Sequence, residues 1–223
     1  MGRLGHLGQA EDAVVETGGL HLGSLRHSQL NVMNPQEPHG PEYHIGDVKT
    51  SNAGPARSTV LEHMFVLGVD PGLSATGYGL VEGTHPPVAH LAGVIRTDPA
   101  MPITKRLAEL HSGLTQVIKE TGPDVIALEI VFTNRNLQTA ISVGRASGVA
   151  LLAAAQAGIA VHEYAPTAVK SAVTGDGSAK KRQVQEMVAR LLKLGEAPRP
   201  ADAADALALA LCHLRVAPLE RSK

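Results

Sequence analysis

Two short apolar segments, each carrying a single acidic residue, constrain the fold of this chain most strongly. Residues 65–70 (Phe-Val-Leu-Gly-Val-Asp) and 125–130 (Val-Ile-Ala-Leu-Glu-Ile) have the length and composition of buried strands. A lone carboxylate is costly to bury, so Asp70 and Glu129 must each be paired, metal-bound or protonated. The two segments predict a covered sheet that holds carboxylates at its strand ends.

Turn signals and apolar periodicity place the other elements around these strands. We expect further strands at 76–82, 88–96 and 160–164, and helices at 103–120, 137–157, 166–174, 178–194 and 201–214. Ser178 is the expected N-cap of the fourth helix. Three consecutive strands predict an antiparallel meander, and the later strands alternate with helices. The chain is therefore predicted to be an α/β protein with a mixed five-stranded sheet flanked by helices.

The first 63 residues differ from the rest in composition. They are rich in Gly, His, Asn, Pro and Ser and have no sustained apolar period, so we predict a disordered N-terminal tail (1–63). A folded domain (64–216) and a short flexible C-terminus (217–223) are expected to follow. Residues 64–223 carry sixteen basic and fourteen acidic side chains, a balance that is compatible with a polyanionic partner without requiring one.

Cysteine content and hydropathy exclude several classes of protein. The one cysteine, Cys212, cannot form an internal disulfide, and no Cys/His set has the spacing of a zinc site. No uninterrupted apolar run approaches the ~18–20 residues that span a bilayer, and the N-terminus has no apolar signal core. We therefore expect a cytoplasmic protein with no membrane partner.

Two more acids lie at the start of the last predicted helix. Asp202 and Asp205 are three residues apart, so they share one helix face and repel each other unless a cation lies between them. The residues that follow are almost wholly apolar, which indicates a buried helix. Oxygen-only ligands suit Mg²⁺ or Mn²⁺, and two such ions ~3.5–4 Å apart can drive phosphodiester hydrolysis. The residues predicted as catalytic metal ligands are Asp70, Glu129, Asp202 and Asp205.

Each acid also has a structural explanation when it is taken singly. Asp70 fits a turn before Pro71 and Gly72, and Glu129 fits the edge-facing end of a strand. Asp202 complements the helix dipole from the first turn, whereas Asp205 does so less well from the second. It is the combination of the four acids that favours a metal site.

A basic cluster and one aromatic residue are the candidate DNA contacts. Cations at a helix N-terminus oppose the helix dipole and so reduce stability there. This cost favours phosphate contact over a merely solvated face for Lys180, Lys181 and Arg182. Lys170, on the preceding predicted helix, is expected to join them. Phe132, which precedes a polar run ending at Asn136, fits either core packing or a wedge against an unpaired base. His162 and Tyr164 are expected to be ordinary strand residues, and His213 to lie too far along the last helix to share the metal site.

Five motifs occur in order between Met64 and His213. They are Gly68-Val-Asp70-Pro-Gly72 with Thr76-Gly77-Tyr78-Gly79, Glu129-x-Val-Phe132, Ala165-Pro-x-x-Val-Lys170, Gly177-Ser-Ala-x-Lys181 and Asp202-Ala-Ala-Asp205-Ala-Leu-Ala. In this order and spacing, the chain resembles the RuvC family of Holliday junction resolvases, bacterial endonucleases of the ribonuclease H-like fold. The motif positions of the family's four metal-binding acids match the four acids singled out above.

The resemblance implies a homodimer that binds four-way junction DNA during recombination and repair. Each subunit would nick one of two like strands, dependent on Mg²⁺ with Mn²⁺ able to substitute, and leave 5′-phosphate and 3′-hydroxyl ends. It also implies a preferred short cleavage sequence, a wedge role for Phe132 and cooperation with the branch-migration complex of RuvA and RuvB.

Two departures from the family pattern affect DNA contacts rather than the acids. Ile130 stands where the family often has Gln, and Arg145 is displaced by two positions from the arginine in the family's Gly-Gln-Ala-Arg-Gly run. Two rival interpretations stay open at this point. One is an ATP-binding phosphotransferase of the actin-like superfamily, and the other is a non-catalytic junction-binding protein.

Overall fold

The computed structural model describes residues 63–130 and 137–220, which contain one five-stranded mixed sheet. Strands β1 (Phe65–Asp70), β2 (Ala75–Glu82) and β3 (Val88–Arg96) form an antiparallel meander. Strands β4 (Val125–Glu129) and β5 (Ala160–Tyr164) run parallel to β1, giving the order β3-β2-β1-β4-β5. The predicted mixed sheet is confirmed, and each strand bound lies within one residue of its predicted position.

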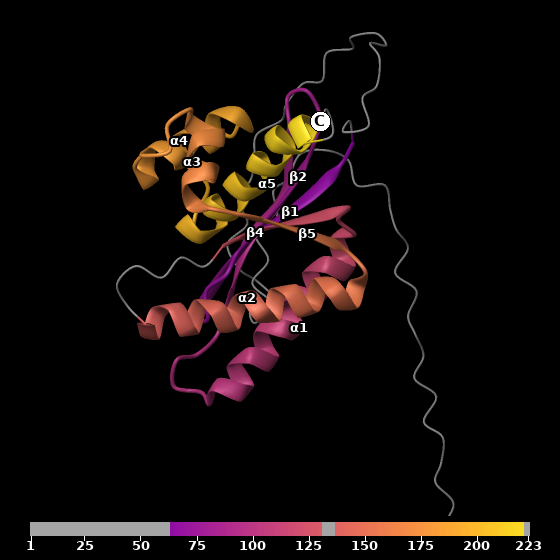
Figure 1. Cartoon of the computed structure of the whole chain (residues 1–223), viewed down its shortest axis with the longest axis vertical. Helices are drawn as coiled ribbons and strands as arrows, with labels where there is room; N and C mark the ends of the chain where they lie inside the picture. Colours follow the sequence, from indigo (N-terminus) through magenta and orange to yellow (C-terminus); the bar gives the residue numbers. More distant parts are fainter. Residues whose placement is uncertain (1–62, 131–136, 221–223) are drawn as a thin grey trace, which may run out of the picture.

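Helices cover both faces of this sheet (Figure 1). Helices α1 (Ile103–Thr121) and α2 (Leu137–Ala157) lie on one face, and α3 (Pro166–Thr174), α4 (Lys181–Leu191) and α5 (Ala201–Glu220) lie on the other. Alternate side chains of a strand point to opposite faces, so β1 supplies both cores. Val66 packs in the cluster that includes α5, whereas Leu67 and Val69 pack in the cluster that includes α1 and α2.

Helix α5 lies directly on the sheet because two strand residues are glycines. A Cβ atom on Gly68 of β1 would lie 1.9 Å from the carbonyl oxygen of Ala206, and one on Gly77 of β2 would lie 2.0 Å from that of Asp202. Only the missing side chains allow this approach. The contact brings the first turns of α5 over the end of β1 that carries Asp70.

Helices α4 and α5 differ from their predicted bounds. The N-cap of α4 is Lys180 rather than Ser178, whose hydroxyl donates instead to Asp176 Oδ1 at 2.7 Å. The serine hydroxyl is therefore used in a local turn with Asp176 and does not cap the helix. Helix α5 continues to Glu220, past the predicted end at Leu214 and into the segment expected to be a flexible C-terminus, because Ala217 extends its buried face. The proposed tail, except His63, lies outside the described residues.

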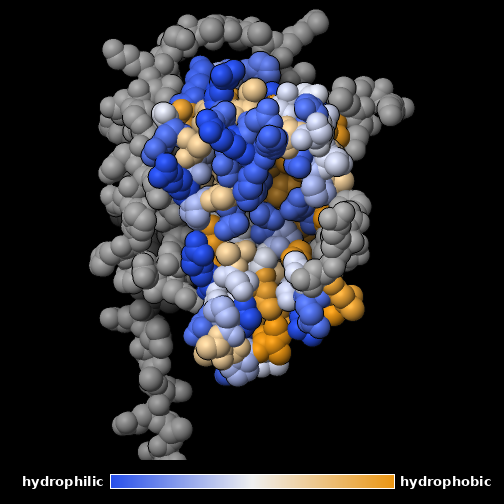
Figure 2. Space-filling view, turned by 90° about the vertical axis from the view of Figure 1, so that its left-hand side faces the viewer, coloured by the Kyte–Doolittle hydropathy of each residue, from blue (hydrophilic) through white to orange (hydrophobic). Residues whose placement is uncertain are grey.

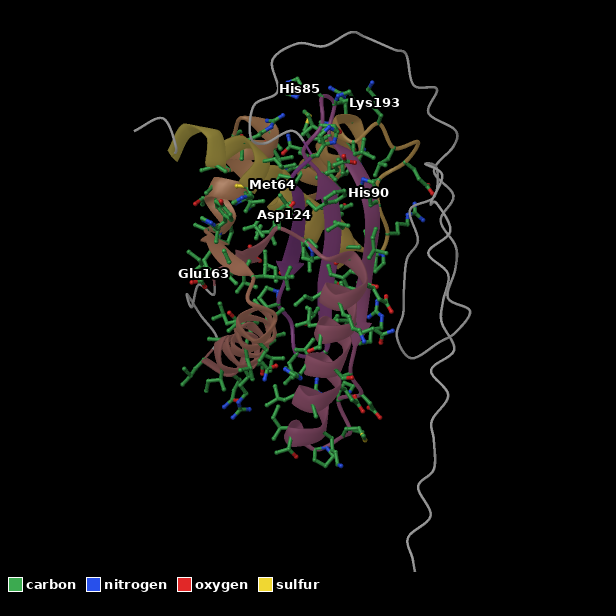
Figure 3. The ribbon with its side chains drawn as sticks, turned by 90° about the vertical axis from the view of Figure 1, so that its right-hand side faces the viewer. Met64, His85, His90, Asp124, Glu163 and Lys193 are labelled. Carbon is green, nitrogen blue, oxygen red and sulfur yellow. The ribbon has the colours of Figure 1, made fainter. Side chains whose placement is uncertain are left out.

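The opposite end of the sheet is closed by polar contacts. Asp124 Oδ2 accepts a hydrogen bond of 2.7 Å from the backbone N–H of Phe65, and Figure 3 shows Asp124 close to Met64 at this end. The Glu82 carboxylate accepts from His63 Nδ1 at 2.9 Å and from His90 Nε2 at 2.8 Å. These contacts hold the start of β1 against its neighbours.

Within the described residues, α2 is the one helix whose length and composition would allow it to cross a membrane. Only 28% of its most apolar 18-residue stretch is buried. The side chains of Leu137 and Leu152 are 72% and 51% exposed. Length and composition alone are weak evidence for a span. The exposed apolar face nevertheless requires an explanation.

Replacing Gly68 by Ala tests the close approach of α5 to the sheet. The added methyl group would overlap the Ala206 carbonyl, so we expect the free energy of unfolding to fall by about 3 kcal/mol or more. Urea denaturation followed by circular dichroism measures the loss. The matched control is Gly195→Ala, where a Cβ meets nothing within 4 Å; similar stabilities for the two variants would contradict the packing argument.

Candidate metal centre

The fold brings the four predicted acids to one edge of the sheet. Strands β1 and β4 pair in parallel as far as Val69 opposite Leu128, and the next residue in each strand is an acid, Asp70 or Glu129. Because parallel strands end at the same edge, the two carboxyl groups meet there, and a hydrogen bond joins them.

The other two acids approach the same edge from α5. Gly77 pairs with Asp70 across the β1–β2 ladder and lies beneath the backbone of Asp202. One helical turn later, Asp205 projects from the same helix face. Carboxylate oxygens of Asp70, Asp202 and Asp205 all lie within 4.8 Å of one another.

Burial and mutual repulsion favour the protonated forms of three of these acids, Asp70, Glu129 and Asp205. Desolvation, followed by the charge of Glu129 and the hydrogen bond to it, raises the pKa of Asp70 to about 8. Burial also raises the pKa of Glu129 and that of Asp205. Near neutral pH the metal-free cluster therefore holds a proton in the hydrogen bond between Asp70 and Glu129.

Lys181 enters the cluster from the first position of α4. Its Nζ lies 2.6 Å from Asp205 Oδ2. Lys181, predicted to contact a phosphate, therefore forms an ion pair with Asp205 in this structure. The signal was absent from the sequence because no basic residue is close to Asp205 along the chain. The contact arises from the packing of α4 against α5, where Val184, Val188 and Leu209 share one buried cluster.

The remaining predicted DNA contacts occupy different places. Lys170 of α3 lines the same pocket as Lys181, whereas Lys180 is exposed and Arg182 pairs with Glu186 at 2.7 Å on the surface of α4. Phe132 and Asn136 lie outside the described residues, so their roles stay predictions. Arg145 is exposed on α2, while Ser147, at the position of the family's arginine, is buried.

A pocket of about 210 Å³ lies beside the acids. Two acids, Glu129 and Asp205, and two lysines contribute its polar lining, and α3, α4 and α5 supply apolar walls. The complete lining consists of Glu129, Pro166, Val169, Lys170, Lys181, Val184, Asp205, Ala208 and Leu209. Acidic and basic groups on one pocket can hold a metal ion and a phosphate side by side.

The donor set fits a hard divalent cation. Among the described residues, the group able to hold an ion consists of carboxylates from β1 and α5, partly shielded from solvent. Oxygen ligands without His or Cys suit Mg²⁺ and Mn²⁺ rather than Zn²⁺. Glu129, hydrogen-bonded to Asp70, is the fourth available ligand.

A buried polar link that the sequence does not predict lies behind this site. Tyr164 Oη and His213 Nδ1 lie 2.7 Å apart, and both residues are buried. The pair joins the end of β5 to α5, the helix that carries Asp202 and Asp205. Neither residue has a local sequence signal for the contact, because its partner is on a distant element.

Replacing Asp70 by Asn is expected to stabilise the metal-free chain, most strongly at high pH. With its pKa raised to about 8, folded Asp70 keeps a proton that the unfolded chain releases near pH 4. Stability therefore falls as pH rises between these values, and Asn removes that loss. We expect the melting temperature in EDTA to rise by ~2–4 °C for each kcal/mol recovered, with a larger rise at pH 9 than at pH 5. A gain that is equal at both pH values would contradict the raised pKa.

Known proteins with related sequences cover almost the whole described domain. Residues 66–213 match the family model of the crossover junction endodeoxyribonuclease RuvC. The RuvC of Chloroflexus aurantiacus is 51% identical over 159 residues, which cover 70% of this chain and 95% of that protein. The RuvC of Thermomicrobium roseum is 51% identical over 161 residues, which cover 71% of this chain and 99% of that protein.

Solved structures agree with the sequence relatives. The Thermus thermophilus RuvC in complex with a Holliday junction substrate has a TM-score of 0.68 and 39% identity, covering 71% of this chain and 97% of its own. The yeast mitochondrial resolvase Ydc2, at 16% identity and a TM-score of 0.51, shares the fold. The predicted ribonuclease H-like fold is thus confirmed. With four acids gathered inside the matched segment, the chain belongs to the RuvC family of crossover junction endodeoxyribonucleases.

Proposed function

We propose that this chain resolves four-way DNA junctions by metal-dependent nicking of two like strands during recombination and repair. The observation that carries the proposal is the convergence of Asp70, Glu129, Asp202 and Asp205 at one sheet edge within the segment that matches the RuvC family. The Thermus thermophilus relative was solved with a junction substrate, which supports the same class of substrate here.

The four acids would hold two Mg²⁺ ions, for which Mn²⁺ can substitute. Held by these acids, the metal would supply an activated water and stabilise the leaving oxygen of the phosphodiester. Asp70 and Glu129 share a proton in the metal-free chain and must release it before both can act as ligands. Lys170, which lines the pocket, would hold a DNA phosphate beside the acids.

DNA contacts outside the acid cluster belong to the same proposal. Lys180 and Arg182 are exposed at the start of α4, where they would bind the phosphate backbone together with Lys170 and Lys181. Phe132 and Asn136 would act at the junction centre, Phe132 by stacking on an unpaired base. We further propose a cytoplasmic location and cooperation with the RuvA and RuvB branch-migration complex, which co-purification on junction DNA would test.

The exposed face of α2 supports a homodimer. Leu137, Ile141, Leu151 and Leu152 are all exposed there, and a Cβ on Gly144 or Gly148 would meet nothing within 4 Å. Figure 2 shows a hydrophilic upper surface over α3 and α4, with apolar residues gathered below it toward α2. Small and apolar residues on one helix allow a second copy to pack closely, and two such subunits would present two active sites to one junction.

A cleavage assay with labelled four-way junction tests the enzymatic proposal. We expect the wild-type chain to make paired nicks with Mg²⁺ or Mn²⁺, and Asp70→Asn to reduce the rate by about 1000-fold or more, because a ligand is lost. The control is Glu163→Gln, which makes the same acid-to-amide change on the exposed side of β5 (Figure 3). Binding without cleavage by the wild type would favour the non-catalytic alternative, and tight ATP binding would favour the actin-like one.

Replacing Leu152 by Glu tests the dimer face. A charge at the centre of an apolar interface is not compensated, so we expect the dissociation constant of the dimer to rise by at least about tenfold. Analytical ultracentrifugation over a concentration series measures it. The matched control is Thr115→Glu on the exposed side of α1. A wild-type monomer, or a dimer that tolerates Leu152→Glu, would contradict the assignment.

A further inference from the structure

An ammonium group of the chain already pairs with one of the four acids. Lys181 Nζ lies 2.6 Å from Asp205 Oδ2. That carboxylate offers an oxygen within 4.8 Å of ligand oxygens on Asp70 and Asp202. The charges of all three aspartates act on Lys181. Lys181 therefore provides the positive charge that the acid cluster requires when no metal is bound.

The backbone under Lys181 is fixed, whereas its side chain is able to move. The Lys180 N–H donates to Gln183 Oε1 at 2.7 Å, and the Val184 N–H donates to the Lys180 carbonyl at 3.2 Å. Ala179 and Val184 on either side are buried in the core. The lysine side chain is 57% exposed, and its four-carbon stem allows the ammonium group to turn toward solvent or a nearby phosphate.

A divalent ion and the ammonium group cannot share Asp205 without strong repulsion. Two cations on one carboxylate are separated by only a few ångströms, and the cluster is partly shielded from water, so the repulsion is poorly screened. Lys170 differs in this respect. It lines the same pocket and acts on Glu129 through its charge, without the short contact to Asp205 that Lys181 makes.

We propose that Lys181 is an exchangeable counter-ion, which neutralises Asp205 in the metal-free chain and is displaced from it when a divalent metal binds. The displaced ammonium is then available to a DNA phosphate at the same site. Metal loading and DNA contact are thereby coupled through one side chain. The inference rests on the proposed metal site and adds a step that the four acids alone do not require.

Metal binding by the DNA-free chain tests the exchange. Lys181→Met keeps most of the stem and removes the charge, so Mn²⁺, measured by electron paramagnetic resonance of the free ion, should bind about three- to tenfold tighter than to the wild type. Lys170→Met removes a charge from the same pocket without freeing Asp205 and should change the affinity by less than about twofold. Circular dichroism melts establish that both variants are folded.

Amine labelling tests the displacement directly in the wild-type chain. The N-hydroxysuccinimide ester of acetic acid should acetylate the Lys181 side chain faster when Mg²⁺ is added, because its amino group is no longer paired with the Asp205 carboxylate. The reference is Lys119, which is exposed on α1 and should react at a constant rate. Mass spectrometry of tryptic peptides measures both rates.

The outcomes separate this inference from the proposed function. If the wild type binds Mn²⁺ and Lys181→Met binds it no tighter, or if Lys170→Met tightens binding equally, the exchange is wrong while the metal site stands. An unchanged labelling rate for Lys181 would overturn the exchange in the same way. If the wild type binds no Mn²⁺, the metal site itself fails, and the exchange fails with it.

Discussion

The contact between the backbone of α5 and the glycines of β1 and β2 determines the arrangement of the rest of the structure. At Gly68 and Gly77 no side chain separates helix from sheet, so α5 lies close enough for Asp202 and Asp205 to reach the end of β1. The same contact closes the core on this face, where α3 and α4 pack beside α5. The acid site and the hydrophobic core thus depend on the same contact between α5 and the sheet. A substitution that moves α5 away from the sheet would disrupt both.

The site formed in this way is electrostatically unfavourable in the absence of metal. Four carboxyl groups, three of them with pKa values raised chiefly by burial, are held together by a shared proton and by Lys181. Such an arrangement reduces stability compared with a neutral cluster. The proposed metal site accounts for this arrangement, because bound divalent cations would recover the lost interaction energy.

The sheet, the order of its strands and helices, and the convergence of the four acids could all be predicted from the sequence. Strand-end acids and the three-residue spacing of Asp202 and Asp205 are local patterns with direct geometric consequences. Contacts between distant elements were not predictable: the Lys181–Asp205 ion pair and the Tyr164–His213 hydrogen bond depend on how helices pack. The predicted N-cap of α4, Ser178, is wrong because its hydroxyl donates a hydrogen bond to Asp176 instead. N-cap propensity alone does not show that a neighbouring acid will bind the serine. Phe132 and Asn136 lie outside the described residues and remain predictions.

The proposed activity depends on these four acids forming one divalent metal site. Anomalous diffraction from crystals grown with Mn²⁺ and an uncleaved junction tests it most directly, since the anomalous signal locates manganese without reference to the protein. We expect manganese peaks at coordinating distance from the carboxylates of Asp70, Glu129, Asp202 and Asp205. Manganese bound elsewhere on the chain, with these four carboxylates left without an ion, would contradict it.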